Sequence, residues 1–298
     1  IEVGGAASHV SRVTPPPDLP PEIAAWFTAR GWRVRRHQLE MLAKARAGRH
    51  ALLVADTGAG KTLAGFLPTL CDFAPSSGAG PGEGLHTLYV SPLKALAQDV
   101  KRNLLTPIED IGLPIRVETR SGDTPSDRKK RQRERPPHIL LTTPESLSLL
   151  LSYPESADLF GGLKRIVIDE VHAFATDKRG DLLALSLARL HALAPAAQRV
   201  ALSATLANPR DFQEWLAPQG AGEAGEIAAA DLVLGEEGAE PEVEILLPIE
   251  ERVPWGGHAG RWAIPQLYES IKANRTTLVF TNTRFLAEFI FQCLWDEN

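Results

Sequence analysis

Short apolar runs alternate along this chain with longer segments in which apolar residues recur at helical spacing. The runs have the length of strands buried in a parallel sheet, and they lie near 51–55, 86–91, 115–119, 138–142, 165–169 and 199–203. The segments between them predict helices, and Asn208-Pro209 has the residue types that begin one. This alternation predicts an α/β fold built on a doubly wound parallel sheet.

The first apolar run leads directly into a glycine-rich turn, and a helical pattern follows. The turn reads Thr57-Gly58-Ala59-Gly60-Lys61-Thr62. Its two glycines let the backbone turn so that successive N–H groups face one anion, and the helix N-terminus adds partial positive charge. This order predicts a phosphate-binding loop, in which Lys61 reaches the β and γ phosphates and the Thr62 hydroxyl binds Mg²⁺. A glycine-rich turn that only opens a helix is the alternative.

The apolar run 166–168 ends in two adjacent carboxylates, Asp169 and Glu170. Ligands of open α/β sheets bind at the carboxyl ends of the strands. Asp169 is therefore expected to hold Mg²⁺, and Glu170 is expected to orient and deprotonate the attacking water. A solvated strand end is the alternative, but the phosphate loop earlier in the chain favours a magnesium site.

His172 lies two residues after the carboxylate pair, and the polar turn LSAT (202–205) ends the last apolar strand. This combination favours a relay in which His172 passes the state of the nucleotide to Ser203 and Thr205. A histidine that makes only a structural hydrogen bond is the alternative. The order and spacing of the loop, the carboxylates and the turn predict ATP hydrolysis coupled to movement along nucleic acid.

Further segments resemble, in order, the motifs of one helicase family. They are WFTARGWRVRRHQ (26–38), HTLYVSPLKALAQD (86–99), RVETRSGDT (116–124), LLTTPESL (140–147), DKRGDLLALSLARL (177–190), LSAT (202–205) and TLVFTNTR (277–284). With the phosphate loop and the DEVH string, they resemble superfamily 2 helicases of the DExH type. The closest likeness is to the bacterial ligase-associated branch of the Lhr (large helicase-related) family, and it runs from about Leu19 to the end of the chain.

The resemblance implies a P-loop, RecA-like parallel-sheet domain followed by the start of a second RecA-like domain. The implied boundaries are a tail over 1–18, a first ATP-binding lobe over 19–217, an interlobe linker over 218–240 and the beginning of the second lobe over 241–298. A strand over 276–280 and an alternating segment over 241–249 are expected in the second lobe.

The resemblance also implies ATP and Mg²⁺ as cofactors and Gln38 as the residue that reads the adenine edge. Nucleic-acid contacts are implied for Ser91, Lys94, Arg120, Ser121, Gly122, Thr143, Thr281, Asn282 and Arg284. The implied activity is 3′-to-5′ translocation on single-stranded DNA with unwinding of a tailed duplex. The implied setting is DNA repair together with a DNA ligase and a nuclease.

Three features depart from the expected pattern. Ala55 stands where the general phosphate loop has glycine, which fits a helicase-type variant. Asp56 stands where the family usually has proline, and we expect it to face solvent because a carboxylate turned toward a triphosphate would repel it. The motifs after 277–284, including the arginine finger, are not in the sequence. We therefore expect a part of a longer protein, with weak turnover alone, since an arginine finger contributes on the order of 10³–10⁵ in rate.

The net charge of −5 argues against a nucleic-acid partner, but the charge is distributed unevenly along the chain. Residues 94–135 hold 11 Lys/Arg and 7 Asp/Glu, whereas residues 219–252 hold one basic and 10 acidic residues. This distribution fits a protein with one face that follows phosphates. The basic cluster RKKRQRER (128–135) is either a DNA clamp or a solvated helix face, and we favour the second.

Cysteine content and hydropathy limit the class of protein further. Cys71 and Cys293 are the two cysteines, and their separation offers neither a disulfide framework nor a metal cluster. The sequence has no apolar run that approaches a membrane span and no signal-peptide pattern, so we expect a cytoplasmic location and no membrane partner.

Two other functions stay open at this point. The chain could be a nucleotide-gated binding module that binds ATP and nucleic acid without processive motion. It could also be an RNA helicase, because the phosphate and adenine motifs are shared between enzymes that act on DNA and on RNA.

Overall fold

The computed structural model describes residues 19–78, 82–174, 177–218, 228–236, 242–245 and 260–298. The chain divides into two compact units, residues 1–238 and residues 239–298. Among the residues that the structure describes, none of the helices combines the length and the apolar character needed to span a lipid bilayer.

The described part of the first unit is built on a sheet of seven strands in the order β3-β4-β2-β5-β6-β1-β7, and every neighbouring pair is parallel. The strands are β1 (Ala51–Val54), β2 (Thr87–Val90), β3 (Val117–Arg120), β4 (Ile139–Thr142), β5 (Arg165–Ile168), β6 (Gln198–Ser203) and β7 (Asp231–Leu234). Toward one side of the sheet, Leu52 of β1 lies opposite Ala201 of β6 and Leu232 of the edge strand β7. The doubly wound parallel sheet predicted from the sequence is thus confirmed.

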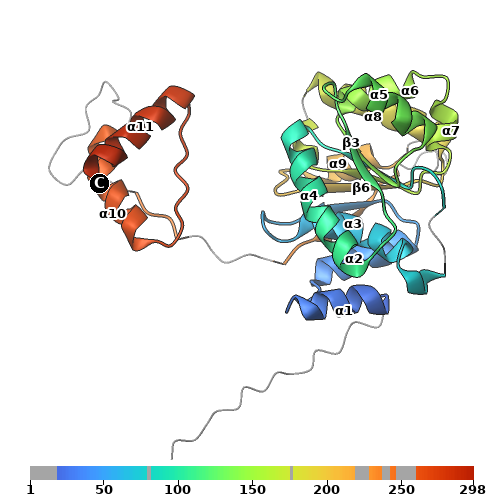
Figure 1. The fold of residues 1–298 in the computed structure, drawn as a ribbon, viewed down its shortest axis with the longest axis horizontal. Coiled ribbons are helices and arrows are strands. Elements are labelled where there is room, and N and C mark those ends of the chain that lie inside the picture. Colours follow the sequence, from blue (N-terminus) through green and yellow to red (C-terminus); the bar gives the residue numbers. More distant parts are fainter. Residues whose placement is uncertain (1–18, 79–81, 175–176, 219–227, 237–241, 246–259) are drawn as a thin grey trace, which may run out of the picture. The chain divides into compact units, whose positions relative to one another are not determined.

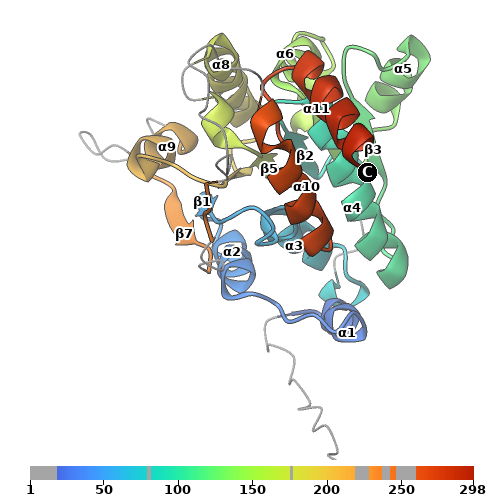
Figure 2. The ribbon, with the colours of Figure 1, turned by 90° about the vertical axis from the view of Figure 1, so that its left-hand side faces the viewer.

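Helices cover both faces of the sheet, which is why its central strands are apolar on both sides. Leu53, Val167 and Leu202 pack with residues of α1, α2, α3 and α4 on one face, whereas Leu52, Ile168 and Ala201 pack with α6, α7, α8 and α9 on the other. Figure 1 shows the two layers of helices with the sheet between them, and Figure 2 shows them turned by 90°. The helices are α1 (Pro21–Ala29), α2 (Arg36–Arg46), α3 (Lys61–Asp72), α4 (Lys94–Ile111), α5 (Ser126–Glu134), α6 (Pro144–Leu151), α7 (Ser156–Phe160), α8 (Lys178–Leu193) and α9 (Pro209–Leu216), with 3₁₀ turns η1 (Pro75–Ser77) and η2 (Val171–Phe174).

Strand β7 lies within residues 218–240, which the sequence assigned to an interlobe linker. The prediction was wrong for Asp231–Leu234, because this segment pairs with β1 and extends the sheet of the first unit. Gly235 continues the strand with its N–H donating to the carbonyl of Val54, and a Cβ there would lie 2.3 Å from Cβ of Ala55. The strand carries a short apolar run, Leu232 to Leu234, but the glycine- and glutamate-rich sequence on both sides of it favoured a linker.

The described part of the second unit consists of η3 (Arg261–Ala263), α10 (Ile264–Ala273) and α11 (Arg284–Glu297). The strand expected over 276–280 is not formed there, and the side chains of Leu278 and Phe280 are 77% and 88% exposed. A strand needs a neighbour to complete its hydrogen bonds, and no strand lies beside this segment among the described residues of the unit. Of the alternating segment 241–249, residues 242–245 form no strand and the rest lie outside the described residues.

Candidate functional site

One edge of the sheet collects the residues for which the sequence predicts chemistry. Because all strands run parallel, their carboxyl ends lie on the same edge, where ligands of such sheets bind. In the spatial order of the strands, Arg120 ends β3, Thr143 follows β4, Ser91 follows β2, Asp169 follows β5, Ser203 ends β6 and Ala55 follows β1. The predicted nucleotide residues thus lie at one half of this edge and the predicted nucleic-acid residues of the first unit at the other.

The phosphate loop connects β1 to α3, and both of its glycines have positive φ values, 81° at Gly58 and 77° at Gly60. A Cβ at Gly60 would lie 2.9 Å from Nε2 of Gln38, so the loop needs glycine for space as well as for conformation. Nζ of Lys61 donates hydrogen bonds to the carbonyl oxygens of Ala55 (2.8 Å) and Asp56 (3.0 Å). In this form the ammonium group binds the loop itself, in the way it would bind phosphate oxygens.

Asp169 is held by donors on both carboxylate oxygens. Oδ2 accepts a hydrogen bond of 2.6 Å from the Tyr89 hydroxyl, and Oδ1 accepts one of 2.9 Å from the backbone N–H of Glu170. Burial raises the pKa of Asp169, although these hydrogen bonds and the charge of Lys61 oppose the rise. A buried carboxylate of this kind is suited to a cation, which would compensate its charge.

Asp169, Thr62, Lys61 and Glu170 line one cavity of about 550 Å³. A carboxylate and a hydroxyl are the hard oxygen ligands that Mg²⁺ prefers, and Mg²⁺ sites at nucleotides use one or two protein ligands with phosphate oxygens and water. The residues present therefore fit the predicted magnesium site, with Asp169 and Thr62 as its protein ligands.

Glu170 has a φ of +48°, which no other non-glycine residue shares among the described parts of the chain. This conformation is costly for a residue with a Cβ, and such strain is often found at functional sites. Oε2 of Glu170 is buried without a hydrogen-bond donor and lies 3.4 Å from Nδ1 of His172. This oxygen is enclosed by the protein, but the Glu170 side chain as a whole is 31% exposed and lines the same cavity as Lys61 and Asp169.

His172 connects the carboxylates to the LSAT turn. Its Nδ1 lies 3.0 Å from Oγ of Ser203, and the Ser203 hydroxyl donates to the carbonyl of Thr205. Because the only hydroxyl proton of Ser203 goes to Thr205, Nδ1 of His172 is the donor in the first bond. The residues predicted for the relay thus form one chain of hydrogen bonds from η2 to the turn that follows β6.

Gln38 and His37 support the phosphate loop from α2. The Gln38 side chain is 3% exposed, accepts from the N–H of Arg35 at 3.0 Å and donates to the carbonyl of Gly60 at 3.4 Å. It lines a cavity of about 880 Å³ that also holds Trp32 and the exposed Asp56. Nε2 of His37 lies 3.0 Å from the carbonyl of Ala59, and burial lowers the pKa of His37, so the ring is neutral and donates through Nε2.

The implied nucleic-acid residues of the first unit differ in their accessibility. Lys94 is exposed and pairs with Asp123 at 2.6 Å, whereas Arg120 is 2% exposed and donates to the carbonyl of Lys129. In this form the Arg120 guanidinium is enclosed between β3 and α5, and its expected contact with phosphates stays a prediction. Burial also lowers the pKa of Arg120.

The other implied contacts are made of short polar groups. Ser91 and Thr143 are 0% and 5% exposed, and their hydroxyls bond to Leu93 and Ser146. The loop after β3 is closed by a bond from the Ser121 N–H to the Thr124 hydroxyl and by one from Lys129 to the Gly122 carbonyl. Thr281, Asn282 and Arg284 belong to the second unit, where Thr281 bonds to the carbonyl of Thr283 and Arg284 pairs with Glu288.

The basic cluster 128–135 forms most of the exposed helix α5. Arg128 and Arg131 pair with Glu118 of β3, and the Arg133 guanidinium lies over the ring of Tyr153. These contacts hold the helix against the sheet and agree with the solvated helix face that the sequence favoured.

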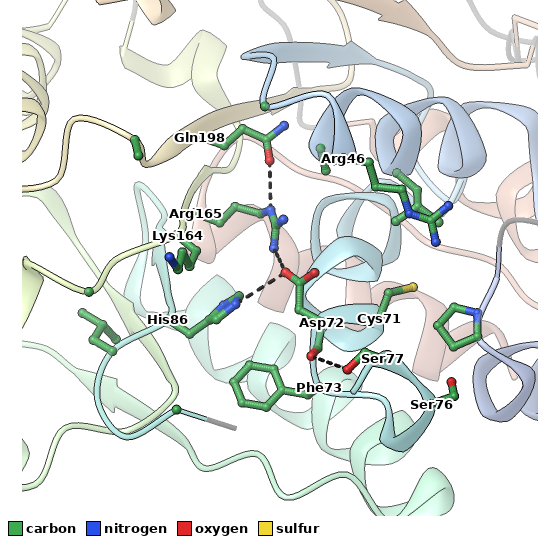
Figure 3. Close-up of a pocket in the computed structure, with 18 of the residues that line it drawn as sticks. Arg46, Cys71, Asp72, Phe73, Ser76, Ser77, His86, Lys164, Arg165 and Gln198 are labelled. Atoms are coloured by element: carbon green, nitrogen blue, oxygen red, sulfur yellow. Dashed lines mark hydrogen bonds and ion pairs between the residues drawn. The ribbon is translucent and has the colours of Figure 1, made fainter. Parts of the chain in front are cut away.

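A second polar region lies at the opposite edge of the sheet, where β5 and β6 begin. Arg165 donates to Gln198 at 3.0 Å and to Asp72 at 3.1 Å, and His86 lies 3.4 Å from the same carboxylate (Figure 3). The cavity beside them has a volume of about 880 Å³. Because each of these polar groups has a partner within the network, we interpret the region as a structural junction between α3 and two strands.

Three residues at the carboxyl-end edge of the sheet, where the predicted site lies, were missed by the sequence analysis. Tyr89, His37 and Arg179 contact, respectively, Asp169, the phosphate loop and the loops after β2 and β4. A role for the Tyr89 hydroxyl could have been suspected from the sequence. It is a polar group in a mostly apolar strand, and a buried hydroxyl needs a hydrogen-bond partner. No local signal distinguishes His37 or Arg179.

Comparison with known proteins places the chain in a family. The model of the DEAD/DEAH box helicases matches residues 35–212. A Lhr helicase/probable uracil glycosylase of Mycolicibacterium smegmatis is 36% identical over 88% of this chain, and an ATP-dependent helicase Lhr-Core of Methanothermobacter thermautotrophicus is 34% identical over 89% of it. The chain spans only 18% and 32% of the lengths of these two relatives.

A solved structure of the Mycobacterium smegmatis helicase Lhr, bound to ssDNA and AMP-PNP, superimposes with a TM-score of 0.72 at 33% identity. The match covers 94% of this chain and 36% of that one. The sheet order, the phosphate loop and the DEVH turn described above thus occur in a chain whose sequence matches the family model over more than half its length. We conclude that this chain belongs to the DEAD/DEAH box helicase family, and the resemblance to the Lhr helicases is confirmed.

Proposed function

We propose that the protein containing this chain is a DNA-dependent ATPase that moves along single-stranded DNA and unwinds duplex. The observation that carries the proposal is the cavity in which Lys61, Asp169 and Glu170 meet, because it joins a phosphate loop, a carboxylate suited to a cation and a second carboxylate. The nucleic-acid loops lie at the same sheet edge, so a change at the nucleotide can alter them.

The catalytic roles follow from the positions of the side chains. Lys61 exchanges the carbonyls of Ala55 and Asp56 for the β and γ phosphates of ATP. Glu170, which lines the cavity, accepts the proton of the attacking water. Mg²⁺, when bound by Asp169 and Thr62, supplies positive charge to the phosphates.

The choice of DNA over RNA is supported by the relative that is bound to ssDNA. Contacts to sugars and phosphates predict binding that is largely independent of sequence and weakens as salt rises. The 3′-to-5′ direction and a role in repair beside a ligase and a nuclease belong to the same proposal, and they rest on the resemblance to the ligase-associated branch.

Phosphate release from Mg-ATP by the full-length protein tests the proposal. We expect strong stimulation by single-stranded DNA and little by RNA of equal length. Equal stimulation by RNA would favour an RNA or hybrid substrate. No stimulation by either, together with nucleic-acid binding that depends on ATP, would indicate a nucleotide-gated binding module.

A further inference from the structure

One guanidinium joins two of the loops at the nucleic-acid half of the sheet edge. Nε of Arg179 donates to Oε1 of Glu145 at 2.5 Å, and its Nη2 donates to the carbonyl of Pro92 at 2.8 Å. Pro92 lies between β2 and α4, and Glu145 lies in the first turn of α6 after β4. Arg179 itself belongs to α8, so three segments distant in sequence meet at one side chain.

The position of Arg179 is fixed by its neighbours in the first turn of α8. The side chain of Asp177 caps this helix by accepting from the N–H of Arg179. A Cβ on Gly180 would lie 2.0 Å from the carbonyl oxygen of Phe174, so only glycine allows the helix to begin this close to η2. The turn η2 follows Glu170 directly. The backbone of Arg179 is therefore held close to the turn that contains Asp169 and Glu170.

The two loops that Arg179 connects each lead into a helix N-terminus. Lys94 begins α4 after the first loop, and Pro144 begins α6 after the second. Backbone N–H groups at helix starts bind phosphate oxygens, and successive phosphates of one strand have a limited range of spacings. The N-termini of α4 and α6 can bind phosphates of the same strand only if the distance between the two N-termini is fixed.

We propose that Arg179 is a positioning residue that holds the loop after β2 and the loop after β4 at the spacing required to bind one nucleic-acid strand. The inference rests on the proposed function and adds a residue for which the helicase motifs predicted no role. An arginine is required because its planar fork directs two donors at once to a carboxylate and a carbonyl, whereas the ammonium of lysine is a single point of charge.

The fold itself should depend little on this contact. The Arg179 and Glu145 side chains are 32% and 52% exposed, and ion pairs of such exposure contribute about 0–1 kcal/mol to stability. Loss of the contact should therefore change the binding of nucleic acid much more than the unfolding temperature.

Binding of a fluorescent single-stranded DNA oligonucleotide to the full-length protein tests the inference, with Arg179→Ala, Arg179→Lys and Glu145→Gln as variants. Arg210→Lys is the matched control, because Arg210 makes a similar pair with Glu214 on α9. We expect Arg179→Ala to raise Kd about tenfold, which corresponds to about 1.4 kcal/mol. Arg179→Lys should fall between Arg179→Ala and wild type, and Arg210→Lys should match wild type.

Two further readouts separate positioning from a general loss of structure. In Arg179→Ala the ssDNA concentration that half-stimulates phosphate release should rise, while turnover at saturating ssDNA stays near that of wild type. The double variant Arg179→Ala/Glu145→Gln should bind no more weakly than Arg179→Ala alone, because both changes remove the same contact.

An unchanged Kd in Arg179→Ala, or a loss of binding equalled by a fall in the unfolding temperature, would overturn the inference. If the wild-type protein binds no single-stranded DNA, the proposed function fails first and the inference fails with it. The two failures are thus distinguished by the wild-type measurement.

Discussion

The Tyr89 hydroxyl donates a hydrogen bond of 2.6 Å to Oδ2 of Asp169, across the boundary between β2 and β5. Both side chains are buried, at 0% and 7% exposure. Burial and the neighbouring Asp169 charge raise the pKa of Tyr89, so the hydroxyl stays a donor throughout the working range of pH. The orientation of Asp169, the proposed magnesium ligand, is therefore set by the neighbouring strand as well as by its own.

Tyr89→Phe should weaken the response to Mg²⁺. The phenylalanine ring can keep the stacking of Tyr89 on Phe66, whose ring centroids are 5.5 Å apart, but it removes the donor from Asp169. Loss of a hydrogen bond to a metal-binding side chain typically costs about 10–100-fold in metal affinity or activity. Phosphate release measured against Mg²⁺ concentration checks this, with Tyr268→Phe in the second unit as the control. The same Mg²⁺ dependence in Tyr89→Phe and wild type would contradict the role given to Tyr89.

Glu170→Gln should separate ATP binding from ATP hydrolysis. Glutamine has nearly the same shape but cannot accept the proton of the water, and a general base contributes about 10²–10⁴ in rate. We expect nucleotide binding near that of wild type, measured with a fluorescent ATP analogue. Phosphate release should be lowered at least about 100-fold. Normal turnover by the purified variant would rule out Glu170 as the base.

Lys61→Ala should abolish turnover and also weaken nucleotide binding. The alanine removes the only lysine of the phosphate loop, and with it the charge that faces the β and γ phosphates. The same two assays, run beside Glu170→Gln, distinguish the roles, because Glu170→Gln should keep binding and Lys61→Ala should not. Equal nucleotide affinity in Lys61→Ala and wild type would contradict the phosphate contact.

Ser203→Ala should uncouple ATP turnover, at the nucleotide half of the sheet edge, from unwinding at the nucleic-acid half. The change removes the acceptor of His172 Nδ1 and the donor to Thr205, while Lys61, Asp169 and Glu170 keep their partners. We expect ATP turnover within a few-fold of wild type and unwinding of a tailed duplex lowered about tenfold or more. Ser186→Ala is a suitable control, since it removes a buried hydroxyl that bonds only within α8. Parallel losses of turnover and unwinding would argue against a relay.

His50 should make stability depend on pH below neutrality. Its pKa is lowered from 6.5 to about 4, first by burial and then by Arg199, whose backbone N–H donates to Nδ1 of His50. Between these values the unfolded chain binds a proton that the folded chain does not, so stability falls as pH drops from about 6.5 to about 4. With allowance for solvent, the loss is on the order of 2 kcal/mol.

His50→Asn should reduce this dependence, because the asparagine oxygen can accept the same hydrogen bond and does not titrate. Urea unfolding at pH 7 and pH 5 checks the prediction, and the difference between the two midpoints should be smaller in the variant. An equal difference in the variant and in wild type would assign the pH dependence to other groups.

The parts of the site that could be predicted are those encoded by neighbouring residues. The phosphate loop depends on residues 57–62, which are adjacent in sequence, and so do Asp169 and Glu170 at the end of one apolar run. Tyr89 could not be predicted as the partner of Asp169, because the two are separated by 80 positions and only the register of β2 with β5 brings them together.

The same reason explains where the structure differs from what the local sequence suggests. Arg120 has the residue type and the loop position of a phosphate ligand, but the packing of α5 against β3 encloses it. The short strand β7 has an apolar run of only three residues within a glycine- and glutamate-rich stretch, and its partner β1 lies about 180 positions earlier. In both cases a distant element decides the local environment.

Strand β1 lies between β6 and β7, the last two strands of the sheet to leave the ribosome. A nascent chain that ends before Gln198 has the whole sequence of the phosphate loop but neither neighbour for the strand that precedes it. Pairings of such long sequence separation form late in folding, because the entropy of closing the intervening chain must first be overcome. We therefore expect nucleotide binding to need both neighbours of β1, so that ATP stabilises the finished sheet more than it guides the early assembly of the sheet.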